Sequence, residues 1–459
     1  MRKRKKAVCN MQLFVRDKQF YKTTVKIAVP IVLQSMITIG VNMMDTFMVG
    51  KLGEVQLSAT SLANEFINIF HIMCMGMGYG AAVLTAQYWG AKDIPSLKKI
   101  TAIMLRICLV LATLFMVLTL AAPEWIMKLY TKDTAIIAEG EKYFTISAFT
   151  YLLLGLSLTL TAIMRSVREV KLPLITSIIA FFVNIFFNWV FIFGNLGAPA
   201  MGVEGAALGT LIARVVETGI IAGYFLFLDK KVEFRIPDIF VNCREYIPRY
   251  LKYCIPVLIS DTLLAFGNNM VAVIMGHIGA AFVAANAIVA QVQRMSTVFT
   301  QGVSNASSVI TGNTLGTGDK KKTYEQGVTF LSLSVLIGLV AGGIILAICP
   351  LIVGGFDLAD DTRQIADQLM YAVAIMIIFQ SVNSVLTKGV LRGGGDTRFL
   401  MVADILFLWL ASIPLGYLAG LVLHLPAFWI YAALKADWVI KSVWCTFRLL
   451  KGNWMKRTV

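Results

Sequence analysis

A single carboxylate interrupts a long apolar stretch near the start of the chain. Asp45 lies in the segment Gly40–Gly50, whose sequence GVNMMDTFMVG is otherwise suited to lipid. A charged side chain at the centre of a membrane helix costs about 2.5–3.5 kcal/mol on the insertion scale. Asp45 therefore needs a polar partner, a water-filled cavity or a function.

Three asparagines are predicted to share the depth of Asp45. Asn184 and Asn188 lie one helical turn apart in FFVNIFFNWVFIFG, and Asn42 precedes Asp45 by about one turn. Carboxylate and amide oxygens are the ligands that hard cations prefer, so these four residues predict a site for a proton or Na+. The alternative is that the asparagines only hold neighbouring helices together by hydrogen bonds.

Two more carboxylates, Asp261 and Asp404, lie in apolar segments of the second half. They could form a second site, for a coupling cation or for substrate, with Arg294 and Lys388 as candidate counter-ions. A structural ion pair is an equally good interpretation for Asp404, because buried charges are usually paired.

Other polar motifs do not support catalysis or a bound cofactor. The glycine-rich RGGGDT lacks the lysine and hydroxyl residue of a phosphate loop. His71, His277 and His424 are isolated, and the seven cysteines show neither disulfide nor metal spacing. We therefore expect no catalytic residue, no cofactor, and no metal beyond Na+ at Asp45 or Asp261.

The elements that carry these residues are predicted to be membrane helices. Of 459 residues, 58% are hydrophobic and only 15% are charged, against roughly 25% charged in soluble domains. Apolar runs of about 20 residues, enough to cross a bilayer, recur along the chain. Twelve spans are predicted, at 27–49, 62–87, 100–122, 136–164, 172–194, 204–228, 252–276, 285–312, 324–350, 366–391, 399–422 and 427–447.

The net charge of +15 does not indicate a nucleic-acid partner, because the basic residues sort by side of the membrane. Lys and Arg concentrate in the N-terminal tail, residues 1–26, and in every second connection. This asymmetry predicts a multi-pass plasma-membrane protein with both termini in the cytoplasm. Membrane lipid is then the expected surrounding.

An internal repeat predicts two six-helix bundles. At an offset of 226, Pro30–Asp93 aligns with Pro256–Asp319 without a gap, and at 227 Arg165 aligns with Arg392. Such duplicated bundles share an orientation and bind substrate between the halves. The predicted parts are the tail, an N-terminal lobe at 27–235, and a C-terminal lobe with a short cytoplasmic tail at 236–459.

The repeat also isolates four polar residues that occur in one copy only. Their counterparts are unlike them: Asp45 aligns with Val271, Asn188 with Leu415, Asp261 with Ser35, and Asp404 with Ser177. A residue needed only by the shared fold would tend to appear in both copies. These four are therefore the strongest candidates for function.

Several motifs together resemble the multidrug and toxic compound extrusion (MATE) family over nearly the whole chain. They are VNMMDTFMVGKLGE, AQYWGAKD, NIFFNWVFIFG, MGVEGAALGT, ANAIVAQV and GVLRGGGDT. The resemblance implies twelve helices in two lobes and no enzyme activity. It also implies multidrug efflux of organic cations or amphiphilic drugs in exchange for Na+ or H+, by alternating access. We expect a monomer.

The resemblance also implies roles for particular residues. Asp45 matches the family's cation-coupling aspartate, and Asn184 and Asn188 match its second polar pair. In the C-terminal lobe Asn383 stands at a position that is acidic in one branch, so that Asp261 and Asp404 would supply the charge there. The alternative function is a lipid-linked oligosaccharide flippase of the same superfamily, whose cleft would be expected to carry clustered arginines.

Overall fold

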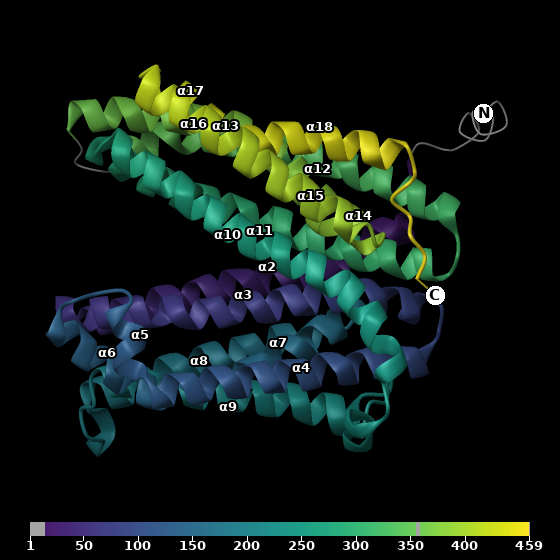
Figure 1. Ribbon diagram of the computed structural model, residues 1–459, viewed down its shortest axis with the longest axis horizontal. Helices are drawn as coiled ribbons and strands as arrows, with labels where there is room; N and C mark the ends of the chain where they lie inside the picture. The colour runs from purple at the N-terminus through teal and green to yellow at the C-terminus, as the bar shows by residue number, and fades with distance from the viewer. Residues whose placement is uncertain (1–13, 355–358, 459) are drawn as a thin grey trace. The chain divides into compact units, whose positions relative to one another are not determined.

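The structure, a computed structural model, describes residues 14–354 and 359–458. Within these ranges the regular secondary structure is helical throughout, with no strand (Figure 1). The first half of the predicted basic tail, residues 1–13, lies outside the described residues, and its remainder leads into the first helix at Lys18.

The N-terminal half contains eight described α-helices and three short irregular helical segments. They are α2 (Lys18–Gly50), α3 (Glu54–Gly90), α4 (Ile94–Ala121), α5 (Pro123–Lys128), α6 (Thr134–Ser147), α7 (Thr150–Ser166), α8 (Lys171–Phe193), η1 (Asn195–Gly197), α9 (Val203–Gly223), η2 (Tyr224–Leu228) and η3 (Ile236–Phe240).

In the C-terminal half, several helices are continued by wider π-helical turns. The elements are η4 (Arg244–Tyr246), α10 (Ile247–Ile278), α11 (Ala280–Gly316), α12 (Lys320–Gly354), α13 (Asp360–Ser384), η5 (Val385–Val390), α14 (Leu391–Gly393), α15 (Thr397–Phe407), η6 (Leu408–Ser412), α16 (Ile413–Tyr417), η7 (Leu418–Val422), α17 (Ala427–Leu434) and α18 (Ala436–Leu450).

Each of the twelve predicted spans falls on one helix or on a broken helix. Within the described residues, nine helical stretches are long and apolar enough to cross a membrane, and the pair α6 and α7, bent by 56°, makes a tenth. The other two predicted spans, on α11 and on α17 with α18, do not meet this test of length and hydropathy. α11 is rich in Asn, Gln, Ser and Thr, and the last span breaks at Lys435 between α17 and α18.

Two compact units divide the chain. One contains residues 33–85 and 93–254, and the other contains residues 14–32, 86–92 and the described residues from 255 onward. We call them the N-unit and the C-unit. The boundary predicted for the two lobes, at 235 and 236, stays a prediction.

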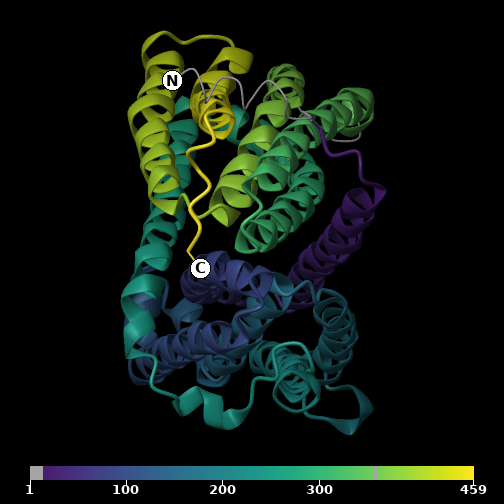
Figure 2. The ribbon, with the colours of Figure 1, turned by 90° about the vertical axis from the view of Figure 1, so that its right-hand side faces the viewer.

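The N-unit packs around a group of aromatic rings. Phe70 of α3 contacts Phe115 of α4 and Tyr151 of α7, with ring centroids 5.3 and 5.1 Å apart. Figure 2 views many helices nearly along their axes and shows α4, α7, α8 and α9 gathered into a bundle. Aromatic pairs of this kind add to the burial that holds a bundle together.

The C-unit has an extended apolar core. Buried side chains of α10, α11, α12, α13 and α17 form one cluster that includes Val271, Val289, Ile345, Leu369 and Tyr431. Val271 is only 2% exposed. The position that aligns with Asp45 is therefore part of a dry core in this half.

The repeat is visible in matching details of the backbone. Asp93 accepts a hydrogen bond from the Ser96 backbone N–H at 3.1 Å, and Asp319 accepts one from that of Lys322 at 2.9 Å. These aspartates cap α4 and α12, which are equivalent helices. The duplicated all-helical architecture is thus confirmed.

The ends of α3 and α11 also meet reciprocally within the C-unit. A side chain at Gly90 would collide with the Asn313 carbonyl, and one at Gly316 would collide with the Gln87 carbonyl. At the offset of 226, Gly90 aligns with Gly316 and Gln87 aligns with Asn313. In this local contact each glycine therefore plays the part of its equivalent in the other copy of the repeat.

Candidate cation sites

The first site is a chain of amide groups that ends on Asp45. The side-chain N–H of Asn188, in α8, donates to the Asp45 carboxylate at 2.6 Å and to the Asn184 side-chain oxygen at 3.4 Å. Asn184 donates in turn to the Thr210 hydroxyl at 3.4 Å. The structure therefore brings together three of the four residues predicted for this site.

Asn188 is held by the close packing of α8 on α9. Gly209 lies directly against it, and a Cβ at this position would collide with both the Asn188 side-chain oxygen and its backbone N. Asn188 is fully buried, and its Oδ1 accepts no hydrogen bond within the described part of the chain. Hard cations coordinate oxygen atoms of this kind, so the predicted use of Asn188 as a ligand is compatible with its buried acceptor and stays a prediction.

Asn42, the fourth predicted residue, lies apart from this group. Its side chain is exposed on α2, and its backbone carbonyl accepts a hydrogen bond from the Thr46 hydroxyl. Among the residues described, none joins the Asn42 side chain to Asp45.

Asp261 is paired with an arginine inside the C-unit. An Arg392 guanidinium N–H lies 3.3 Å from the Asp261 carboxylate, with exposed side-chain fractions of 5% and 18% respectively. Arg392 stands in α14, at the end of a π-helical turn, so the wide turn and the short helix position it. The arginine was predicted as part of the repeat but not as this partner.

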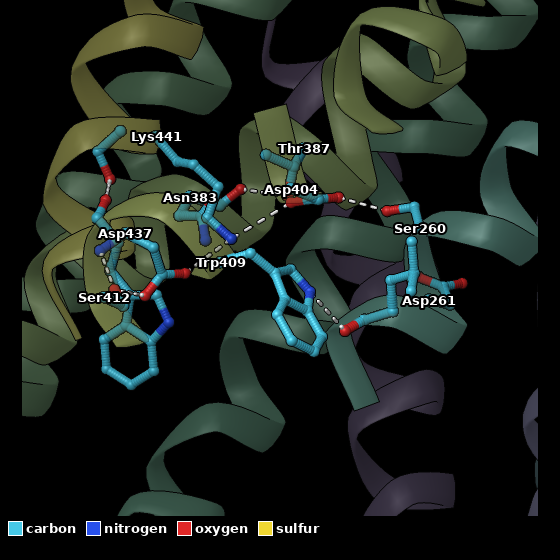
Figure 3. A network of polar contacts seen from close by, with 12 residues as sticks. Ser260, Asp261, Asn383, Thr387, Asp404, Trp409, Ser412, Asp437 and Lys441 are labelled. Carbon is cyan, nitrogen blue, oxygen red and sulfur yellow. Dashed lines mark hydrogen bonds and ion pairs between the residues drawn. The ribbon is translucent and has the colours of Figure 1, made fainter. Parts of the chain in front are cut away.

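Asp404 belongs to a buried charged cluster. Lys441 of α18 places its ammonium 3.2 Å from Asp404 and 2.9 Å from Asp437 (Figure 3). The Ser260 hydroxyl donates to Asp404 at 2.6 Å, and the Ser412 hydroxyl donates to Asp437 at 2.9 Å. All five side chains come from buried residues.

The counter-ions of these carboxylates differ from the predicted candidates. In the described structure Arg294 and Lys388 form no ion pair with either aspartate, and Arg392 and Lys441 take that part. Lys441 was missed because it lies in the last helix, far along the chain from Asp404, and Asp437 was predicted to be only a structural group paired with Lys435. The four-residue spacing of Asp437 and Lys441 on one helix face was the available signal.

Asn383 lies beside this cluster on α13, as Figure 3 shows. It is 9% exposed, and its side-chain Oδ1 has no hydrogen-bond donor among the described residues. Its backbone carbonyl accepts a hydrogen bond from the Thr387 hydroxyl at 2.8 Å.

The two units build equivalent contacts from different residue types. At the offsets of the repeat, Gln34 aligns with Ser260, Ser177 with Asp404, and Arg165 with Arg392. In the N-unit, Gln34 donates to Ser177 at 3.0 Å and accepts from Arg165 at 2.5 Å. The same three positions carry an arginine with two neutral residues in the N-unit, and an arginine, a serine and a carboxylate in the C-unit.

Comparison with known proteins places the chain among related sequences. The MatE family matches at residues 30–190 and again at 256–418, once in each half. A probable multidrug resistance protein NorM of Thermotoga maritima is 23% identical, with 95% of this chain and 94% of that protein covered. A protein of the same name from Agrobacterium fabrum is 26% identical, with 86% of each chain covered.

Solved structures agree with the fold. An outward-facing multidrug resistance MATE family transporter superposes with a TM-score of 0.84 at 18% identity, covering 96% of this chain and 99% of that one. A Vibrio cholerae MATE transporter gives a TM-score of 0.86 at 14% identity, covering 95% and 98%. With both halves matched by the family, the chain belongs to the MATE family of membrane transporters.

Proposed function

We propose that this protein is a secondary active multidrug efflux transporter. It exports organic cations or amphiphilic compounds in exchange for Na+ or H+ by alternating access, and it needs no cofactor. The names of its relatives support the substrate class. Residence in the plasma membrane as a monomer, with both termini in the cytoplasm, belongs to the same proposal.

The observation that carries the proposal is that Asp45 forms no ion pair with a described basic residue. Asp261, Asp404 and Asp437 each have a Lys or Arg within 4.0 Å, whereas the described residues place no such partner at Asp45. Asn188 donates a hydrogen bond to it at 2.6 Å, and Arg214 acts on it only from beyond ion-pair distance. A membrane carboxylate with amide support and no resident cation is suited to take up and release a free one.

Exchange requires only that the coupling ion and the substrate favour different conformations. An ion at Asp45 that stabilises one state lowers the affinity of a substrate that prefers the other, by the same factor in both directions. We assign Asp45, Asn184 and Asn188 to ion binding. Asn42 joins this assignment as an exposed neighbour on the same helix.

The C-unit carboxylates take a different part in this proposal. Asp261 and Asp404 already have cations of the chain beside them, so we assign them, with Asn383, to substrate binding or to positioning and not to uptake of the coupling ion. The flippase alternative has less support, since Arg392 is already paired with the Asp261 carboxylate and Arg165 is hydrogen-bonded to Gln34.

Transport from proteoliposomes tests the proposal. Efflux of a fluorescent organic cation is followed with a Na+ gradient and a pH gradient imposed separately. Efflux driven by either gradient, and lost in Asp45→Asn protein that remains monodisperse, is the expected result. Gradient-independent behaviour of the wild-type protein, or full coupling in the variant, would contradict it.

A further inference from the structure

The cluster around Lys441 has the composition of a cation site. Two carboxylates from separate helices meet at one position, Asp404 from α15 and Asp437 from α18. The Ser260 hydroxyl of α10 and the Ser412 hydroxyl of η6 each donate to the other oxygen of one carboxylate. Hard cations such as Na+ take carboxylate, hydroxyl and amide oxygens in this way. What occupies the position in this chain is the ammonium of Lys441.

The cluster has more acceptors than donors. Two carboxylates lie within 3.2 Å of one ammonium, in a region whose members are only 3–5% exposed as side chains. A second basic residue, Lys435, acts on Asp437 without forming an ion pair with it in the described structure. The buried Asn383 Oδ1, without a donor among the described residues, lies beside them (Figure 3). An unpartnered oxygen at the edge of an acidic cluster points to a position shaped for a cation.

The repeat shows that the ammonium is a particular choice at this position. Lys441 aligns with Arg214, which pairs with Glu217 on its own helix at 2.6 Å. Asp437 aligns with Thr210, the neutral partner of Asn184. The N-unit cation therefore pairs with Glu217 and forms no ion pair with Asp45 in the described structure, while the C-unit inserts a cation between two carboxylates.

We propose that the Lys441 ammonium is a resident, covalently attached cation in an alkali-cation site, and that it makes this site independent of Na+. Removal of the lysine side chain opens the site to Na+. This inference concerns binding alone, so it does not depend on the transport proposed above.

The test compares Na+ with choline on the purified full chain in lipid nanodiscs. All variants carry Asp45→Asn, which removes the other candidate site. Lys441→Gln protein is expected to bind ²²Na+ saturably and to unfold about 2–4 °C higher in NaCl than in choline chloride. Both effects should disappear when Asp404→Asn is added. Protein with Lys441 intact, or with Lys441→Arg, should show neither effect.

Two results would overturn the proposal. One is Na+ binding that depends on Asp404 while Lys441 is present. The other is Lys441→Gln protein that is monodisperse and behaves identically in both salts. If Lys441→Gln is monodisperse only in NaCl, that requirement itself supports the site. If it folds in neither salt, Lys441→Gln combined with Asp437→Asn leaves one carboxylate, and the same Na+ and choline criteria apply to it.

Discussion

The two halves of this chain use one fold for two different electrostatic arrangements. In the N-unit the polar cluster contains one carboxylate, Asp45, and its support is an amide at 2.6 Å. In the C-unit the carboxylates of interest, Asp261, Asp404 and Asp437, lie beside two basic residues, Arg392 and Lys441. The N-unit therefore leaves its carboxylate open to a free cation, and the C-unit supplies cations of its own.

The clusters also occupy different positions in the repeat. Asp45 and Asn188 align with Val271 and Leu415, of which Val271 lies in the apolar core of the C-unit. Asp404 aligns with Ser177, a neutral residue that accepts a hydrogen bond from Gln34 and donates one to the Pro173 carbonyl. Duplication preserved the helix contacts, and the chemistry at each contact then diverged.

Removal of the Lys441 side chain should give the largest loss of stability. It is therefore the strongest test of the difference in charge compensation between the two units. Lys441→Met leaves Asp404 and Asp437 buried without their cation, which costs about 3–5 kcal/mol. The matched change Arg214→Met should cost about 1 kcal/mol or less, because Arg214 is 33% exposed and has one partner. Unfolding in lipid bicelles measures both, and equal losses would show that the compensation is not specific to the C-unit.

The equivalent arginines provide a second, smaller contrast. Arg392→Gln removes the cation beside Asp261 and should cost about 1.5–3 kcal/mol, since that hydrogen bond joins two charged groups. Arg165→Gln should cost about 0.5–1.5 kcal/mol, because its partner Gln34 is neutral and can bond to an amide. The same unfolding measurement applies. A larger loss of stability for Arg165→Gln would contradict the claim that the charged pair in the C-unit contributes more than the contact with a neutral partner in the N-unit.

Within the N-unit cluster the expected effects are on ion affinity. Asn188→Ala removes the 2.6 Å hydrogen bond to Asp45 and should change the ion concentration for half-maximal efflux about tenfold. Asn184→Ala removes contacts of 3.4 Å only and should change it about threefold or less. Efflux titrated against the driving ion distinguishes the two, and the reverse order would exclude Asn188 as the main support.

Most of the fold followed from the sequence for simple physical reasons. Apolar runs of bilayer length require helices, and the offset repeat required two similar bundles. The broken span at Lys435 and the π-helical turns were not predictable, because hydropathy reports length and composition but not the hydrogen-bond pattern within a helix.

The site was predicted unevenly. Asp45, Asn184 and Asn188 could be grouped because two of them share a helix face and all three share a depth. The partners of Asp261 and Asp404 could not be chosen, because Lys388 and Arg294 were as plausible in depth as Arg392 and Lys441. Only the packing of α18 on α15 selects Lys441, and tertiary packing has no local signature.

The central claim is that the free ion couples to transport at Asp45. Gradient-driven efflux and substrate counterflow, measured on the same Asp45→Asn proteoliposomes, test it most directly, since counterflow needs substrate exchange but no ion gradient. We predict that counterflow persists while gradient-driven efflux is lost. Loss of both together would make Asp45 part of substrate binding, and retention of both would contradict the account.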